Sequence, residues 1–399
     1  MTPFKINSID IKGIGPILDL HLNFNPHFNV ICGANGVGKT TVLDCIAQLF
    51  VYQQLTVRCN ASMATGEWSA CFDYGTELGK TMKRTTRRKY LNEKPEHGHF
   101  SPQTDSLLVF KVNRIMTYVD VQTISKDPVI DQGALDAMTH NGISYNQIKH
   151  WFVNRYLWSK HENGLNEVQK SNLHIALECF HIINPDFSFK SVSPETFDVL
   201  INSSLGDIEM EQLSSGYSAM LVVLLGIIKE IEYRYKDAHT KKPLVKVEDF
   251  AGVVILDEMD VHLHPTMQAQ MYLALKSLLP NAQVITSTHS PHVIQIASPS
   301  EIIPLVRDAS GVHANPLVNH EYGCQGWTVE EILEDVMDMR DTRTKEYHDL
   351  IHVFNEGIDS GDADGAKTAY DKLTKMLHPS SVLREVLKIQ MMGVVNDLH

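Results

Sequence analysis

The sequence predicts an α/β fold followed by an all-helical segment, and three observations support this prediction. The strand pattern FNVIC, residues 28–32, enters a glycine-rich turn, after which apolar residues recur at helical spacing. Residues 253–290 repeat the order strand, helix, strand, and Pro265 is well placed to open the helix. From about residue 328 onward only helical patterns remain. Because strands that alternate with helices form helix-covered sheets, we expect a buried sheet in the front part of the chain.

Further strands are expected near the start of the chain. Ile9 and Ile11 point to one face of a strand, and the apolar residues from Leu18 to Phe24 also recur with a period of two. Residues 64–92 contain two or three more strand patterns, with turn signals at DYG and LGK. This part of the chain therefore predicts a β-rich lobe.

The remaining elements are helical. Residues 144–182 have helical spacing, and the unbroken apolar run at residues 220–228 is typical of a buried helix. Residues 346–358 and 365–377 each carry apolar side chains at i, i+3 and i+4, separated by the turn DSGDADG. The last two segments predict a pair of antiparallel helices. The same turn approximates a calcium loop, but Ser360 stands where that loop has its first Asp, so we favour the helix connection.

Length and composition limit the class of protein. With 399 residues the chain can form one large or two modest domains. It has no apolar stretch of about 18 to 20 residues and no signal-peptide layout, so we expect a cytoplasmic protein without a membrane partner. The 6 cysteines include no C-x-x-C pair, which favours reduced thiols over zinc or disulfides.

A short basic stretch stands out in this acidic chain. The net charge of -13 argues against binding nucleic acid by overall attraction, so any such binding would need a local patch. Residues 80–94 provide one, and two interpretations stay open: a charged, solvated hairpin edge, or a nucleic-acid contact. The candidate contacts for DNA are Lys83, Arg84, Arg87 and Arg88.

The turn after FNVIC matches the phosphate-binding pattern G-x-x-x-x-G-K-[ST]. GANGVGKTT, residues 33–41, lies between the predicted strand and helix, which is the context that this motif requires. Glycines allow backbone N–H groups to surround a phosphate, and Lys39 adds a positive charge. The hydroxyl of Thr40 is a ligand for Mg²⁺. The residues expected to contact ATP are Gly33, Asn35, Gly36, Val37, Gly38, Lys39, Thr40 and Thr41.

The sequence VVILDEMDVHLHP, residues 253–265, ends an apolar strand in two adjacent acids. Such acids can simply cap a buried strand. With a phosphate loop upstream, however, a P-loop NTPase needs one acid for its Mg²⁺ and another for the attacking water. We therefore expect Asp257 to face the metal and Glu258 to act on water. The pair His262 and His264 also invites a metal site, which we do not favour.

Two further segments complete the set of motifs. LSSGYSAM, residues 213–220, places Ser214, Ser215 and Gly216 at the head of a helix, where exposed N–H groups form a second anion site. TSTHSPH, residues 286–292, places His289 just beyond another buried strand. There an imidazole could reach a γ-phosphate, although a lone histidine is more often structural.

The ordered set GANGVGKT, LSSGY, VVILDEMDVHLHP and TSTHSP resembles the ABC-type ATPases of the SMC and RecF class. It is most similar to their compact branch, which includes OLD-like ATPase domains, the predicted ATP-binding proteins involved in virulence, and the PtuA proteins of Septu-type phage defence. The resemblance implies a P-loop NTPase fold with an ABC-type head over residues 1–325. That head has a mixed sheet core, an antiparallel β lobe and a helical signature lobe at about 130–235, and residues 326–399 form a C-terminal helical domain.

The resemblance also implies a shared nucleotide between two copies of the chain. The phosphate loop and Asp257 of one copy would grip ATP together with Ser214, Ser215 and Gly216 of the other. Glu258 would polarise water, His289 would be the switch histidine, and Asp260 would lie in a loop between subunits. The implied cofactors are ATP and Mg²⁺, the implied reaction is ATP hydrolysis, and the implied assembly is a homodimer or a higher homo-oligomer.

Some positions depart from the ABC pattern. Asn113 and Arg114 occupy the place of the Q-loop glutamine, while Ser215 and Tyr217 replace the usual Gly and Gln of the signature. The helical residues after TSTHSP do not suit the TOPRIM nuclease domain of OLD-type proteins. We therefore expect a separate effector, such as an HNH-type nuclease, and a sensor role in anti-phage defence that can involve DNA. The alternatives are a RecF-like DNA repair ATPase and the nucleotide-binding subunit of a transporter.

Overall fold

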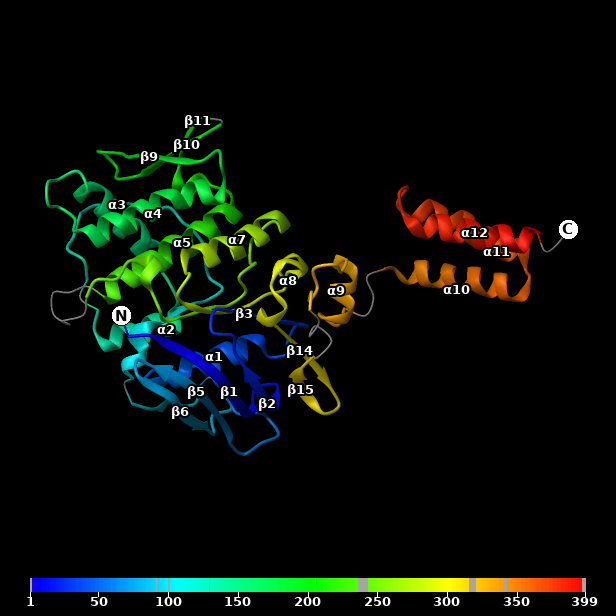
Figure 1. Ribbon diagram of the computed structural model, residues 1–399, viewed down its shortest axis with the longest axis horizontal. Coiled ribbons are helices and arrows are strands. Elements are labelled where there is room, and N and C mark those ends of the chain that lie inside the picture. The colour runs from blue at the N-terminus through cyan, green and yellow to red at the C-terminus, as the bar shows by residue number, and fades with distance from the viewer. Residues whose placement is uncertain are drawn as a thin grey trace. The chain divides into compact units, whose positions relative to one another are not determined.

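The computed structural model describes residues 2–90, 92–99, 101–128, 130–204, 206–235, 243–315, 321–339 and 343–396. The chain divides into two compact units, Met1–Asp338 and Met339–His399. The first unit contains all of the strands described here (Figure 1). No described helix is long and apolar enough to cross a membrane.

A six-stranded sheet forms the centre of the first unit. Its order is β15-β14-β3-β13-β12-β8, and every neighbouring pair from β14 to β8 is parallel. Only the edge pair β14 and β15 is antiparallel. The sheet is therefore mixed, and the carboxyl ends of its parallel strands share one edge. Its strands are β3 (Phe28–Gly33), β8 (Leu107–Phe110), β12 (Val253–Leu256), β13 (Gln283–Ser287), β14 (Ile302–Asp308) and β15 (Gly311–Ala314).

Both faces of this sheet are covered, which explains the unbroken apolar runs in its strands. Val253 and Ile255 belong to the core that includes α1 (Lys39–Leu49), whereas Val254 and Leu256 belong to the core of the helical lobe. Successive side chains of a strand alternate between faces, so one short segment contributes to two cores.

An antiparallel sheet covers the α1 side. Its order is β2-β1-β5-β6, from β1 (Phe4–Ile14), β2 (Ile17–Asn23), β5 (Gly66–Tyr74) and β6 (Glu77–Thr86). Ile9 and Ile11 are fully buried there, as expected, but Leu18 is 44% exposed close to the turn that joins β1 and β2. A separate pair joins β4 (Gln53–Gln54) to β7 (Glu96–His97).

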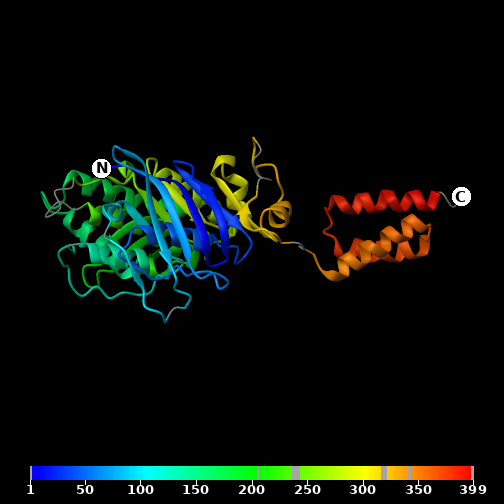
Figure 2. The same cartoon turned by 90° about the horizontal axis from the view of Figure 1, so that it is seen from below.

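The helical lobe covers the opposite face (Figures 1 and 2). Its helix α5 begins at the predicted signature and is buried along nearly its whole length, as the apolar run predicts. The expected helical segment 144–182 is two helices rather than one. The lobe contains α3 (Tyr145–Trp158), α4 (Glu167–Ile183), α5 (Ser215–Arg234), α7 (Pro265–Leu278) and a sheet of β9 (Ser188–Val192), β10 (Val199–Ser203) and β11 (Gly206–Glu209). Helix α2 (Gln132–Asn141) lies beside the end of α1, where His140 Nδ1 is 3.1 Å from Gln48 Nε2.

Two short helices, α8 (Pro291–Ile296) and α9 (Val329–Asp335), complete the first unit. The second unit contains α10 (Lys345–Ser360), α11 (Ala363–Met376) and α12 (Val382–Asn396) around a core centred on Phe354. Asp362 caps α11, and its side chain accepts a hydrogen bond from the backbone N of Gly365. This bond fits the helix connection that the turn predicted.

Candidate functional site

The phosphate loop connects β3 to α1, and its glycines adopt backbone conformations that other residues rarely adopt. Gly33 has a φ of 135°, and a Cβ there would overlap the carbonyl oxygen of Leu305. Gly38 has a φ of 120° and lies against Ile17. Glycine is needed at both positions because the loop packs closely between β14 and the β1–β2 hairpin.

Lys39 is buried at the start of α1. Its Nζ donates to the carbonyl oxygens of Gly33, at 2.8 Å, and Ala34, at 3.0 Å. Burial lowers the pKa of Lys39, and the nearby Cys32 and Glu258 partly oppose this shift. The ammonium group is thus held inside the loop where a phosphate would need it.

A second cation supports the loop from outside. Arg307, on β14, donates from Nη2 to the carbonyl oxygen of Gly36 at 2.9 Å. Arg307 has no signal in the sequence, because nothing in its local pattern shows that β14 lies beside β3 in the sheet.

Asp257 lies directly after β12 and meets the phosphate loop. Its Oδ1 accepts hydrogen bonds from Thr40 Oγ1, at 3.1 Å, and from Ser287 Oγ, at 2.7 Å. Two strands and the first turn of α1 therefore place a carboxylate and a hydroxyl side by side. Oxygen ligands of this kind suit Mg²⁺.

Glu258 occupies a strained turn that other residues hold in place. Its φ is 48°, which is unusual for a residue other than glycine. Ser287 Oγ accepts a 2.6 Å hydrogen bond from the Glu258 backbone N. Arg114 donates to the backbone carbonyl oxygens of Asp257 and, at 3.0 Å, of Glu258. The residue found in the Q-loop position thus clamps the turn that carries Glu258.

His289 lies beside the same edge, just after β13. Asp260 fixes its loop by accepting hydrogen bonds from Thr288 Oγ1, at 2.6 Å, and from the His289 backbone N, at 3.1 Å. Burial and then the positive charge of Lys39 lower the pKa of His289, against the pull of the acids. The direction of this shift favours the neutral imidazole.

The signature turn occupies another part of the unit. Ser214 is the N-cap of α5, yet its side chain makes no cap bond, and both Ser214 and Ser215 are exposed. Gly216 is buried against Met267 and the carbonyl oxygen of His262. Within the described residues, no hydrogen bond joins this turn to residues 33–41. The remaining predicted loop residues are Asn35, which is exposed, Val37, which is buried, and Thr41, which is partly buried.

The basic stretch divides into buried and exposed side chains. Arg84 and Arg88 are only 9% and 7% exposed and donate to backbone carbonyls, so these two cannot contact nucleic acid as predicted. Alternation along β6 turns Arg84 inward, and Arg88, which follows the strand, binds the carbonyl oxygens of Gln54 and Leu55. Lys83 and Arg87 are exposed. Lys83 lies on the edge strand β6, and its Nζ forms an ion pair with Glu67 Oε2 of β5 at 2.7 Å.

The alternative metal sites lack a ligand cluster. Throughout the described ranges, no group of three or more His, Cys, Asp or Glu side chains could hold a metal ion. His262 is exposed with a φ of 64°, and His264 Nδ1 lies 3.0 Å from Thr266 Oγ1.

Two family models and a solved structure are similar to parts of this chain. Residues 8–94 match the AAA domain family, and residues 139–294 match the AAA ATPase domain family. The SMC head domain from Thermotoga maritima superposes with a TM-score of 0.44 at 14% identity, covering 78% of this chain and 99% of that one.

Two curated relatives carry more detailed names. The probable ATPase of retron Ec83 from Escherichia coli is 27% identical over 205 residues, which are 50% of this chain and 36% of that protein. The Septu protein PtuA from Bacillus thuringiensis is 39% identical over 388 residues, which are 96% of this chain and 97% of that protein. This chain therefore belongs to the Septu PtuA family of nucleotide-binding ATPases.

Proposed function

We propose that this protein binds and hydrolyses ATP, pairs with a second copy through shared nucleotides, and acts as a sensor in anti-phage defence. The arrangement of Lys39, Asp257, Glu258 and His289 at one edge of the sheet carries the first part of the proposal. The uncapped serine turn of α5, on the same chain, carries the second.

The residues present fit a magnesium nucleotide. The glycine loop leaves no room for side chains at Gly33, and the Thr40 hydroxyl lies beside the Asp257 carboxylate. Thr40 and Asp257 would hold Mg²⁺, which supplies charge neutralisation at the phosphate oxygens. Lys39 would contribute a second positive charge to the same oxygens.

Glu258 is the residue that we assign to the attacking water. Its carboxylate follows the metal-side acid by one residue, and the clamp formed by Arg114 and Ser287 fixes the direction of its backbone. A carboxylate in a fixed position can orient water and accept its proton. The neutral imidazole of His289 can donate a hydrogen bond to a phosphate oxygen from the neighbouring strand end.

The serine turn suits a nucleotide held by another copy. Ser214 and Ser215 present exposed hydroxyls at the start of α5, a 20-residue helix whose N–H groups favour anions. Within one chain this turn makes no hydrogen bond to the phosphate loop, at least among the described residues. A head-to-tail pair of chains would bring each turn to the other chain's loop.

A subunit-mixing experiment tests the shared site. Lys39→Ala removes the phosphate-loop charge, and Ser214→Arg blocks the signature turn, so each variant alone should be inactive. An equimolar mixture should recover about a quarter of the native phosphate release, because half of the dimers would contain one intact composite site. Mixing each variant with itself is the control. No recovery in the mixture, with both variants folded, would contradict the shared nucleotide.

Membership of the Septu PtuA family supports the defence role and a separate effector, such as an HNH-type nuclease. Lys83 and Arg87 are exposed and remain candidate contacts for DNA. The test is a pull-down from phage-infected host cells, with and without ATP. Recovery of a nuclease supports this role, recovery of replication or repair proteins supports a RecF-like repair ATPase, and recovery of a permease supports a transporter subunit.

A further inference from the structure

A segment without regular secondary structure leaves the nucleotide site and crosses the helical lobe. We call residues 111–128, between β8 and α2, the strap. Near its start, Arg114 is 4% exposed and binds the carbonyl oxygens of Asp257 and Glu258. The position of the strap is thereby tied to the turn that carries the two acids.

Further along, the strap is tied to α3 by the completely buried side chain of Lys149. The Nζ of Lys149 donates to the backbone carbonyl oxygen of Val119 at 2.8 Å. The same Nζ lies 2.7 Å from Asp198 Oδ1 and 2.6 Å from Glu211 Oε1. A lysine has three donors, and all three are used here.

Glu211 connects this lysine to the signature turn. It lies three residues before Ser214, in a short 3₁₀ helix at Met210–Gln212. Tyr145 OH also donates to Glu211 Oε1 at 2.8 Å, so the carboxylate is held by two residues of α3. Burial lowers the pKa of Lys149, but its bonds to Asp198 and Glu211 outweigh this effect and raise the pKa overall.

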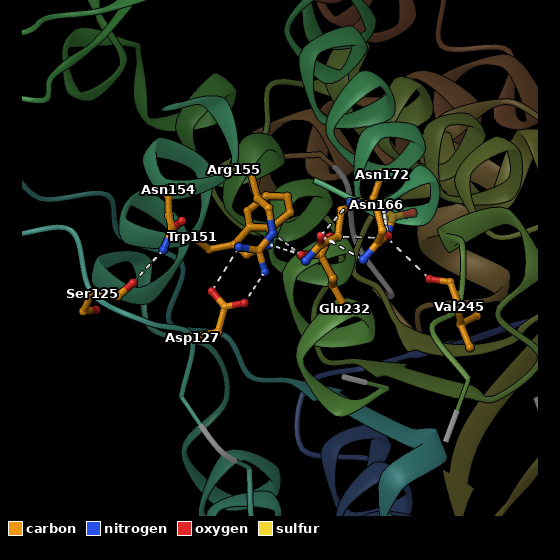
Figure 3. A network of polar contacts seen from close by, with 10 residues as sticks. Ser125, Asp127, Trp151, Asn154, Arg155, Asn166, Asn172, Glu232 and Val245 are labelled. Carbon is orange, nitrogen blue, oxygen red and sulfur yellow. Dashed lines mark hydrogen bonds and ion pairs between the residues drawn. The ribbon is translucent and has the colours of Figure 1, made fainter. Parts of the chain in front are cut away.

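The far half of the strap is fixed to the same helix (Figure 3). Asn154 donates to the carbonyl oxygen of Ser125 at 2.7 Å. Arg155 binds Asp127 with both terminal nitrogens, and its Nε binds Glu232 of α5. The strap, α3 and α5 are therefore joined by several buried polar contacts. Among the described residues, Lys149 is the side chain that binds both the strap and Glu211, in the segment that leads into the signature turn.

We propose that Lys149 is a positioning residue that couples the nucleotide site of each chain to its own signature turn. The connection runs from the carbonyls of Asp257 and Glu258 through Arg114 and the strap to Lys149, and from Lys149 through Glu211 to Ser214. Lys149 touches no nucleotide in this arrangement. It sets the position of the turn that grips the partner's ATP, so this inference rests on the proposed shared site.

The test separates nucleotide binding from pairing. The parent protein is the Glu258→Gln variant, which should accumulate the ATP-bound pair. Adding Lys149→Met should leave binding of a fluorescent ATP analogue to dilute monomer within about twofold, because the phosphate loop is unchanged. ATP-dependent association, measured by sedimentation velocity, should weaken at least about tenfold. Association as strong as in the parent would overturn the proposal.

A matched lysine controls for the loss of a buried charge. Lys229 is also completely buried in this lobe, where it binds Gln147 and Glu230 and, within the described part of the chain, makes no hydrogen bond to the strap. Lys229→Met should leave ATP-dependent association unchanged. Glu211→Gln is a second, more conservative variant, because it keeps the Lys149–Asp198 ion pair and weakens only the contact between Lys149 and the segment before the signature turn. It should also weaken ATP-dependent association.

Hydrogen exchange distinguishes failure of this inference from failure of the shared site. In dilute monomer, ATP should change the exchange of amides at residues 210–217 in the parent but not in the Lys149→Met variant. If the parent does not pair with ATP, the shared site is wrong, and this exchange measurement still decides the coupling. An ATP-induced change that persists in the Lys149→Met variant refutes the role of Lys149.

Discussion

Replacing Arg114 with alanine tests whether this side chain maintains the turn that carries Glu258. The guanidinium makes two hydrogen bonds to backbone carbonyls, and charged hydrogen bonds contribute about 1.5 to 3 kcal/mol each. Burial lowers the pKa of Arg114 to about 10 from 12.5, a penalty of about 3 kcal/mol on the charged form. These contributions largely cancel, so the free energy of unfolding should fall by no more than about 3 kcal/mol.

The effect on catalysis should be much larger. The left-handed φ of Glu258 costs about 1 to 3 kcal/mol. Without the hydrogen bonds from Arg114, fewer contacts oppose this strain, so the turn should relax. A displacement of about 1 Å can reduce a rate by about 10²-fold, so kcat for ATP hydrolysis should fall by about that factor. The KM for ATP should change little, because the phosphate loop is untouched.

Arg234 provides a matched control. It is also buried, and it donates to Glu230 and to the backbone carbonyls of Thr104 and Leu107, at the start of β8, whereas Arg114 follows the end of that strand. Arg234→Ala should destabilise the protein by about 3 to 5 kcal/mol, because it breaks a buried ion pair, yet kcat of the folded protein should stay close to native. Urea denaturation and steady-state phosphate release measure both quantities. An Arg114→Ala protein with native kcat would refute the clamp.

Three further predictions concern the same site. Glu258→Gln should lower phosphate release by at least about 10²-fold while ATP binding persists, as equilibrium binding and product assays would show; hydrolysis at the native rate would exclude Glu258 as the group that acts on water. Gly33→Ala should abolish ATP binding, because its Cβ would overlap Leu305. Gly36 has open space and a φ of 72°, so Gly36→Ala should reduce the free energy of ATP binding by only about 1 kcal/mol. Equal losses of ATP binding in the two variants would contradict this view of the loop. Burial lowers the pKa of His289 below 6.5. As the pH falls, the unfolded state therefore binds the extra proton first. The stability due to neutral His289 should be present above pH 6.5 and lost as the pH falls below it. Thermal unfolding of the native protein and of His289→Gln between pH 5 and 8 would measure this difference, and identical pH profiles would contradict it.

Much of the fold could be predicted from local patterns. The spacing of apolar residues indicated β3, α1, the buried helix α5 and the pair α10 and α11, because burial on one face or both leaves a period in the sequence. The glycine loop and the acids after β12 were also visible, since each motif is contiguous and its chemistry depends on neighbouring residues.

Other features depend on contacts between distant segments. Arg114 contacts residues 143 and 144 positions away, and Arg307 supports a loop 271 positions away. Neither contact has a local signature. The sequence predicts Arg84 and Arg88 as candidate nucleic-acid contacts, but both are buried: sheet pairing turns Arg84 inward, and Arg88 binds the carbonyl oxygens of Gln54 and Leu55.

The sequence by itself determined which residues are the candidates for phosphate, metal and water chemistry, because these motifs require fixed residue types at fixed spacing. Only the tertiary structure decided how they are held. The order β14-β3-β13-β12-β8 brings the loop, Asp257 and His289 to one edge. The packing of distant segments places Arg114, Arg307 and Lys149 against backbone carbonyls. A carbonyl group is the same in every residue, so the partners of these cations leave no trace in the sequence.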